Sequence, residues 1–155
     1  MNQEQNNLIE SARQQAEGYF KKGDYYCSEA VLTTINQLLG EELPPEIVKL
    51  ASGFPVGIGK SKCLCGAISG GVMALGLKYG RTEPKAEMPS NSFLRSEGLH
   101  DYIKDKYGST CCRVITAKFK DFASPERVEH CIGITGDVAA WVMSKFIEDG
   151  VLINN

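Results

Sequence analysis

The chain has 155 residues, of which 43% are hydrophobic and 23% charged, and its 17 basic and 19 acidic residues give a net charge of −2. These values lie near the averages for globular proteins, so we expect a single compact domain over residues 1–155 and exclude extensive disorder. Nucleic acid is excluded as an expected partner because Lys and Arg are not in excess. Membrane insertion is excluded because no run approaches about 20 apolar residues.

The first third of the chain has the pattern of three helices. Apolar residues at three- and four-residue spacing predict helices over 3–22 and 25–39. Gly23 and Gly40 follow these two patterns and are expected to end the helices. The two prolines of ELPPEIVKLASG suit a first helical turn, which predicts a short helix over 45–53.

The rest of the chain alternates between loops and helices. Glycine and proline interrupt any regular pattern over 53–62, so this segment is predicted to be a loop. Ser124, Pro125 and Glu126 combine a cap, a proline and an acidic residue, which is typical of a helix start. No segment alternates as a strand would, so we predict an all-α domain of five to seven helices. The remaining helices are expected over 65–80, 91–108 and 125–149, with a short helix after the adjacent cysteines within 111–122 and a polar loop over 81–90.

Six cysteines distinguish the sequence. The N-terminus, MNQEQNNLIESARQQ, has no basic or apolar region of the kind found in signal peptides, so we expect a cytoplasmic location. Clustered cysteines in reducing compartments more often bind metal or carry out redox chemistry than form structural disulfides. Cysteine also serves as a small buried hydrophobic residue, and this alternative stays open. The six are Cys27, Cys63, Cys65, Cys111, Cys112 and Cys131.

The expected helices bring several of these cysteines into related positions. Cys27 lies in a first helical turn, and Cys131 lies on the apolar face of the last helix. Cys65 stands at a helix start, where the helix dipole is expected to lower its pKa and favour the thiolate. Adjacent positions on a helix point roughly 100° apart, so only one of Cys111 and Cys112 is expected to face the others. We therefore predict four sulfurs in one partly buried pocket.

Three neighbouring residues are candidates to support that pocket. Gly66 and Gly70 are four positions apart, so they share a helix face on which a backbone or a cofactor can approach closely. Arg113 is a candidate source of positive charge beside a thiolate or a cofactor.

Other motifs give little support for further chemistry. GFPVGIGKS has Phe54 where a phosphate-binding loop needs glycine, and no C-x-x-C-H motif for haem attachment is present. His100 and His130 are expected to be ordinary side chains. His130 adjoins Cys131, however, and stays open as a metal ligand.

The order of these motifs resembles the redox-active family called C_GCAxxG_C_C. The resemblance rests on CSEAV at Cys27, CGAISG at Cys65, Cys112 followed by Arg113, Cys131, and the flanking GGVMALGLKYG, and it covers about residues 10–147. The resemblance implies a helical fold in which Cys27, Cys65, Cys112 and Cys131 are the functional cysteines, with Cys63 and Cys111 as additions. The sequence is also similar to the non-haem domain of split-Soret cytochrome c, which implies an iron–sulfur centre.

Two redox chemistries are compatible with four clustered cysteines. The sequence does not decide whether the protein is an oxidoreductase or an electron carrier. In the first, the four cysteines bind an iron–sulfur cluster, with the two-iron form favoured, and the protein passes electrons to a redox partner protein. In the second, Cys65 attacks a disulfide and Cys112 is a candidate to resolve the intermediate. A structural zinc site with Cys₄ or Cys₃His ligands, using His130 or His100, and a metal-free interaction protein are the further alternatives. A homodimer also stays open.

Overall fold

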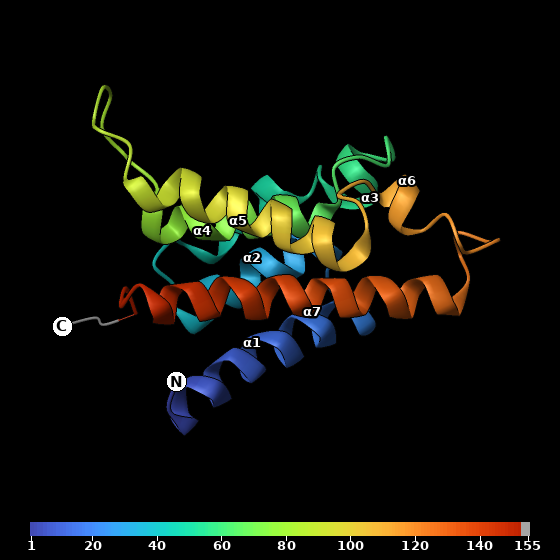
Figure 1. Ribbon diagram of the computed structural model, residues 1–155, viewed down its shortest axis with the longest axis horizontal. Coiled ribbons are helices and arrows are strands. Elements are labelled where there is room, and N and C mark those ends of the chain that lie inside the picture. Colours follow the sequence, from blue (N-terminus) through green and yellow to red (C-terminus); the bar gives the residue numbers. More distant parts are fainter. Residues whose placement is uncertain (153–155) are drawn as a thin grey trace.

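The computed structural model describes residues 1–152, and the end of the expected domain, residues 153–155, lies outside that range. Helices, turns and irregular segments make up the described residues, with no strand among them, so the predicted all-α fold is confirmed. Figure 1 shows the helices gathered into one bundle. In chain order they are α1 (Gln3–Lys21), α2 (Cys27–Leu38), the 3₁₀ helix η1 (Pro45–Ala51), α3 (Pro55–Ile58), α4 (Gly66–Tyr79), α5 (Ser90–Tyr107), α6 (Cys112–Ile115) and α7 (Pro125–Glu148).

The ends of the long helices carry the chemistry that the sequence predicts. Asn2 and Gln5 form a reciprocal capping box at the start of α1. The Ser124 hydroxyl accepts a hydrogen bond from the Arg127 N–H at 3.2 Å, and Pro125 occupies the first position of α7. Gly108 ends α5 in the left-handed conformation, with φ 81°.

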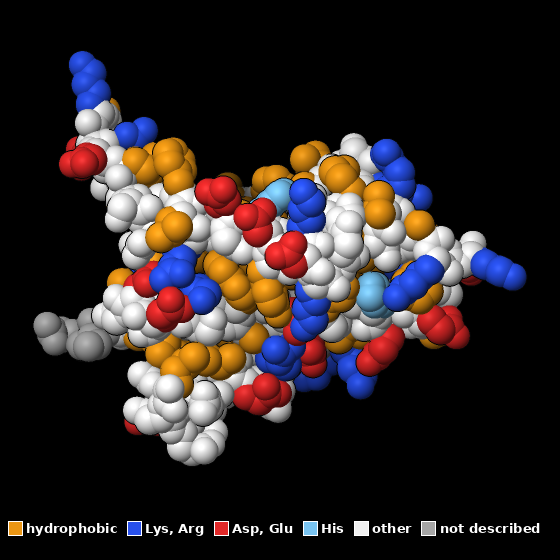
Figure 2. Space-filling model, viewed as in Figure 1, with side chains coloured by type: hydrophobic (Ala, Val, Ile, Leu, Met, Phe, Trp, Pro, Cys, Tyr) orange, Lys and Arg blue, Asp and Glu red, His pale blue; other side chains and the backbone are white. Residues whose placement is uncertain are grey.

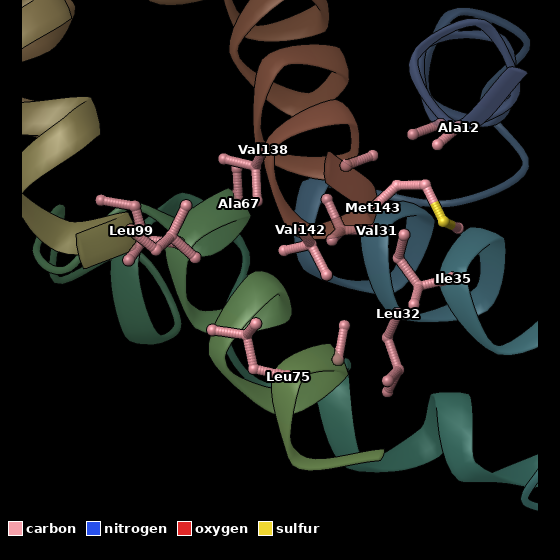
Figure 3. Close-up of a cluster of buried hydrophobic side chains, with 14 of the residues drawn as sticks. Ala12, Val31, Leu32, Ile35, Ala67, Leu75, Leu99, Val138, Val142 and Met143 are labelled. Atoms are coloured by element: carbon pink, nitrogen blue, oxygen red, sulfur yellow. The ribbon is translucent and has the colours of Figure 1, made fainter. Parts of the chain in front are cut away.

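The longest helix, α7, packs against α1, α2, α4 and α5 and organises the core. Its buried side chains interdigitate with those of the surrounding helices, and burying each large aliphatic side chain contributes about 1.5–3 kcal/mol. Figure 3 shows this cluster, which includes Val138, Val142 and Met143 of α7, Val31, Leu32 and Ile35 of α2, Ala67 and Leu75 of α4, and Leu99 of α5. Among the described residues, no helix has the length and apolarity needed to cross a membrane.

The short helix predicted within 111–122 is present as α6, which begins at Cys112 and ends at Ile115. The chain leaves the helix at Thr116, whose hydroxyl hydrogen-bonds to the Cys112 carbonyl oxygen. Further along, the Phe122 carbonyl accepts a hydrogen bond from the Arg127 side chain at the start of α7. Turns and bends fill the rest of this segment up to α7.

Candidate cysteine-lined redox site

Four cysteines from four different elements line one cavity of about 320 Å³. Cys27 is the first residue of α2, Cys65 is the N-cap of α4, Cys112 is the first residue of α6, and Cys131 lies in the second turn of α7. All four sulfurs are free thiols. The other lining residues are mostly apolar and include Phe20, Tyr26, Val56, Phe122, Val128 and Ile134.

Close packing of α4 against α2 brings Cys27 beside Cys65. A Cβ atom on Gly66 would lie 2.5 Å from the Cys27 Sγ and 3.0 Å from the Phe54 carbonyl oxygen. A Cβ atom on Gly70 would overlap the backbone of Ser28. Only glycine fits at these two positions, because any side chain would force the helices apart. The two motif glycines thus serve the approach of a neighbouring backbone.

A short pairing of two loops brings Cys65 beside Cys112. The Cys65 N–H donates a hydrogen bond to the Thr110 carbonyl at 2.8 Å, and the Arg113 N–H donates to the Lys62 carbonyl at 3.0 Å. The segment before α4 and the segment that leads into α6 therefore run side by side. Their pairing places the Cys65 and Cys112 side chains within hydrogen-bonding reach of each other.

Cys112, rather than Cys65, is the acidic thiol of this pair. A hydrogen bond from the Cys65 thiol to the Cys112 sulfur lowers the pKa of Cys112 to about 7, and the Gly66 N–H and the charge of Arg127 assist. The same hydrogen bond, together with burial, raises the pKa of Cys65 well above its ordinary value. The prediction of a lowered pKa at Cys65 was wrong, because the effect of the helix start is outweighed by donation to Cys112 and by desolvation.

The other two cavity thiols are also held in the protonated form. Burial, assisted by negative charge on Cys112, raises the pKa of Cys27 to about 12. Burial raises the pKa of Cys131 as well, although Arg127 opposes this shift with its Nη1 3.8 Å from the Cys131 Sγ. These shifts favour one thiolate, at Cys112, beside three neutral thiols.

Arg127 is the cation beside this site, and the sequence reasoning missed it. Arg113 instead extends away from the cavity and donates a hydrogen bond to the Ser61 carbonyl at 3.1 Å. Arg127 lines the cavity and stacks over the Phe122 ring, 4.1 Å from the ring centroid. Arg127 and Cys131 are four residues apart on one helix face, and this spacing was a signal available in the sequence.

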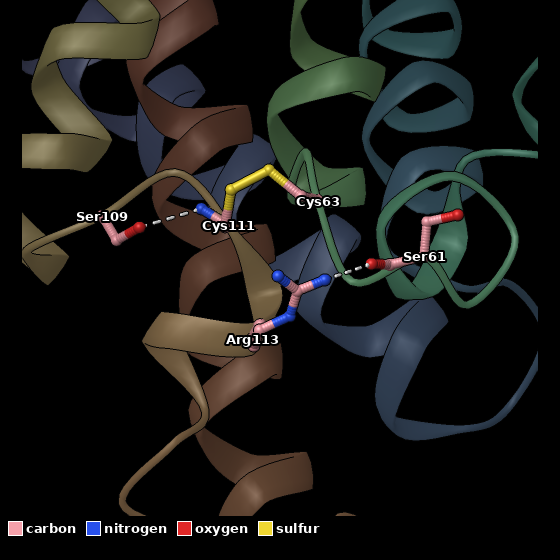
Figure 4. The surroundings of a disulfide bond; sticks show 5 residues. All are labelled: Ser61, Cys63, Ser109, Cys111 and Arg113. Atoms are coloured by element: carbon pink, nitrogen blue, oxygen red, sulfur yellow. Dashed lines mark hydrogen bonds between the residues drawn. A yellow bond between two sulfur atoms is a disulfide. The ribbon is translucent and has the colours of Figure 1, made fainter.

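The remaining two cysteines form a disulfide outside the cavity lining. Cys63 and Cys111 have Cα atoms 4.3 Å apart and are 48 residues apart in sequence. Figure 4 shows the bond between the segment that precedes α4 and the segment that precedes α6. Their pairing was not predicted from the sequence, in which both are additions to the four functional cysteines.

Neither histidine lines the cavity. His100 lies on α5 with its Nδ1 2.9 Å from the Asp101 carboxylate, and His130 packs against the rings of Tyr107 and Phe119. Burial and nearby Lys118 lower the pKa of His130. Within residues 1–152, no three His, Cys, Asp or Glu side chains are arranged closely enough to enclose a single metal ion.

The comparisons with known proteins agree with the cysteine arrangement. A family described as "Putative redox-active protein (C_GCAxxG_C_C)" matches residues 25–145, a range that contains all four cavity cysteines. No curated protein and no solved structure matches the chain. Because the family match spans more than half of the sequence, the chain belongs to the C_GCAxxG_C_C family of redox-active proteins.

Proposed function

We propose that Cys27, Cys65, Cys112 and Cys131 together hold an iron–sulfur cluster and that the protein is an electron carrier. The observation that carries this proposal is the meeting of four free thiols from four elements in one cavity of about 320 Å³. Four cysteine thiolates are the usual ligand set of two-iron and four-iron clusters. Such a cluster accepts and returns one electron.

The chemistry of the lining fits this group. Each iron of a two-iron cluster takes two thiolates, and Cys65 and Cys112 already form one hydrogen-bonded pair. The three thiols with raised pKa are costly to ionise in an apolar cavity, and bound metal offsets that cost by neutralising the thiolates. The Gly66 N–H and Arg127 are donors to sulfur, and hydrogen bonds to cluster ligands tune the reduction potential.

The cavity has an exposed aromatic side chain at its boundary. Tyr26 is 63% exposed, whereas Cys65 is 6% exposed. Cys27, Cys112 and Cys131 are partly exposed, so the site lies near the molecular surface. Electron transfer to a partner protein requires such a position. A cytoplasmic location and an as yet unidentified redox partner protein are parts of the same proposal.

A dithiol–disulfide couple formed by Cys65 and Cys112 is the second candidate function. It is favoured by the hydrogen bond between the two sulfurs and by the Cys112 pKa of about 7. Cys112 would attack a substrate disulfide, and Cys65 would then displace the substrate sulfur, so that two thiols are oxidised as the substrate is reduced. This scheme gives Cys27 and Cys131 no part in the chemistry, which is why the cluster is preferred.

Iron and acid-labile sulfide, measured on protein purified without oxygen, test the proposal. We expect both elements in equal amounts, with broad visible absorption that bleaches on reduction by one electron. Protein that contains neither element, before and after anaerobic reconstitution with iron and sulfide, would contradict the cluster. Formation of a Cys65–Cys112 disulfide in that metal-free protein, identified by peptide mapping, would then establish the second candidate.

A further inference from the structure

A second sulfur pair lies next to the cavity but takes no part in its lining. Cys63 and Cys111 are both half-buried, and their disulfide connects two segments at the surface of the bundle (Figure 4). In a reducing compartment, cysteine pairs that form disulfides are usually catalytic or redox-sensing rather than structural. If the protein is cytoplasmic, as proposed above, a redox role is therefore expected for this pair.

Hydrogen bonds pair the two segments in addition to the disulfide. The Cys65 N–H donates to the Thr110 carbonyl at 2.8 Å, and the Arg113 N–H donates to the Lys62 carbonyl at 3.0 Å. The Arg113 side chain adds a third link to the Ser61 carbonyl at 3.1 Å. Because these hydrogen bonds flank the disulfide, breaking the disulfide is a local event that leaves the neighbouring backbone in register.

The charged residues in the two segments around the disulfide are all basic. Residues 47–82 and 106–120 contain no Asp or Glu, although the whole protein is acidic. Lys62 and Arg113 are exposed. Within residues 1–152, neither has a carboxylate at ion-pair distance. Lys and Arg side chains project from this end of the molecule, over α3 and α6 (Figure 2). A negatively charged reagent is attracted to such a surface, and a positively charged one is repelled.

We propose that Cys63 and Cys111 form a second redox site, which opens and closes by exchange with a small anionic thiol. In the first step the thiolate sulfur of the anionic thiol bonds to one cysteine sulfur, and the other cysteine leaves as a thiolate. A second thiolate then attacks the mixed disulfide. The products are two reduced cysteines and the disulfide of the anionic thiol, so two electrons enter the protein and two leave the thiol.

The exchange uses only Cys63 and Cys111, so it goes beyond the proposed cluster function; it rests on the proposed cytoplasmic location but not on the cluster. The site would let the protein respond to the thiol–disulfide balance around it. The two segments that carry this couple also carry Cys65 and Cys112. Cys63 is two residues from Cys65, and Cys111 is adjacent to Cys112. A change in the redox state of the disulfide therefore takes place next to the cavity cysteines.

Glutathione and cysteamine are the probes that test this proposal. Both attack as thiolates, but the thiolate of glutathione has a net negative charge, whereas that of cysteamine is balanced by its ammonium group. The oxidised full-length protein is incubated with each at equal thiolate concentration, quenched by alkylation in acid, and mapped by mass spectrometry at Cys63 and Cys111. We expect glutathione to open the disulfide roughly fivefold faster than cysteamine at low ionic strength, and added salt to remove the difference.

The matched variants are Lys62→Glu and Lys85→Glu. Both lysines are exposed and have a positive φ, 64° and 61°, but Lys85 lies in the loop between α4 and α5, away from the disulfide. We expect Lys62→Glu to slow the glutathione reaction roughly fivefold and Lys85→Glu to leave it unchanged.

A disulfide that stays closed in excess glutathione would overturn the proposal and make the bond structural. If glutathione and cysteamine open the disulfide of the wild-type protein at equal rates at every salt concentration, the preference for an anionic thiol is overturned. This comparison needs no variant. Iron content, measured on the same samples, reports separately on the cluster, so failure of one proposal is distinguishable from failure of the other.

Discussion

At the residue scale, the chemistry of the site depends on which sulfur holds the proton. Cys65 and Cys112 share a hydrogen bond, and the buried Cys65 keeps the proton because Cys112 receives additional support from the Gly66 N–H and from Arg127. The sequence could not reveal this order, since a helix start predicts acidity at Cys65. Which thiol donates to the other depends on a loop pairing between residues that are far apart in the chain.

Alkylation of the metal-free protein tests this order. We expect iodoacetamide to modify Cys112 before Cys27, Cys65 and Cys131, with a rate that rises as the pH passes about 7, because the thiolate is the reactive form. Peptide mapping over a pH series measures the rate of modification of each cysteine. Arg127→Gln should move the midpoint to higher pH, whereas Arg113→Gln should leave it in place. Faster modification of Cys65 than of Cys112 would refute the assignment.

At the element scale, the approach of α4 to α2 sets the position of Cys27. A Cβ atom on Gly70 would overlap Ser28, whereas one on Gly76 of the same helix would meet nothing within 4 Å. The site therefore requires glycine at one position and merely tolerates it at the other. Local helix propensity alone favours alanine at both, by roughly 0.5–1 kcal/mol.

Two alanine substitutions separate packing from propensity. We expect Gly70→Ala to reduce the free energy of unfolding by about 1–3 kcal/mol, because α4 must move off α2. Gly76→Ala should increase it by about 0.5–1 kcal/mol. Urea denaturation followed by circular dichroism measures both values. Equal effects of the two substitutions would show that the α2–α4 contact is not as close as described.

Much of the architecture could be predicted from the sequence, and the exceptions have physical reasons. The long helices α1, α2, α4, α5 and α7 follow from apolar spacing and end signals, because both act locally. The short helix after the adjacent cysteines, α6, also follows from the sequence. The Cys63–Cys111 pair and the role of Arg127 depend on how loops and helices pack, which local patterns do not encode.

At the scale of the whole molecule, one buried carboxylate ties three helices together. Asp137 of α7 accepts hydrogen bonds from Arg13 of α1 and from Tyr107 of α5, and the Lys106 Nζ lies 2.7 Å from its Oδ2. Burial by itself raises the pKa of Asp137, but the hydrogen bonds from Lys106, Tyr107 and Arg13 outweigh it and leave the pKa below its ordinary value. Ionised Asp137 therefore stabilises the bundle.

The pH dependence of unfolding tests this role. Because the folded pKa is lowered, the stabilisation is complete above the unfolded pKa of about 3.9 and is lost as the pH falls through the folded value. We expect Asp137→Asn to cost about 1–3 kcal/mol at neutral pH, and the difference from wild type to shrink below about pH 4. Asp101→Asn, at an exposed site, is the control. A constant difference across the pH range would contradict this account.

The central claim is that four cysteines form one cluster site, and iron content in single cysteine variants tests it most directly. Iron, sulfide and visible absorption are measured on anaerobically purified wild-type protein, on the four variants Cys27→Ala, Cys65→Ala, Cys112→Ala and Cys131→Ala, and on Cys63→Ala. We predict that the wild-type protein and Cys63→Ala contain iron and sulfide in equal amounts, and that each of the four cavity variants loses most of both. Wild-type iron content in the cavity variants would contradict the claim, as would a wild-type protein that binds neither iron nor sulfide.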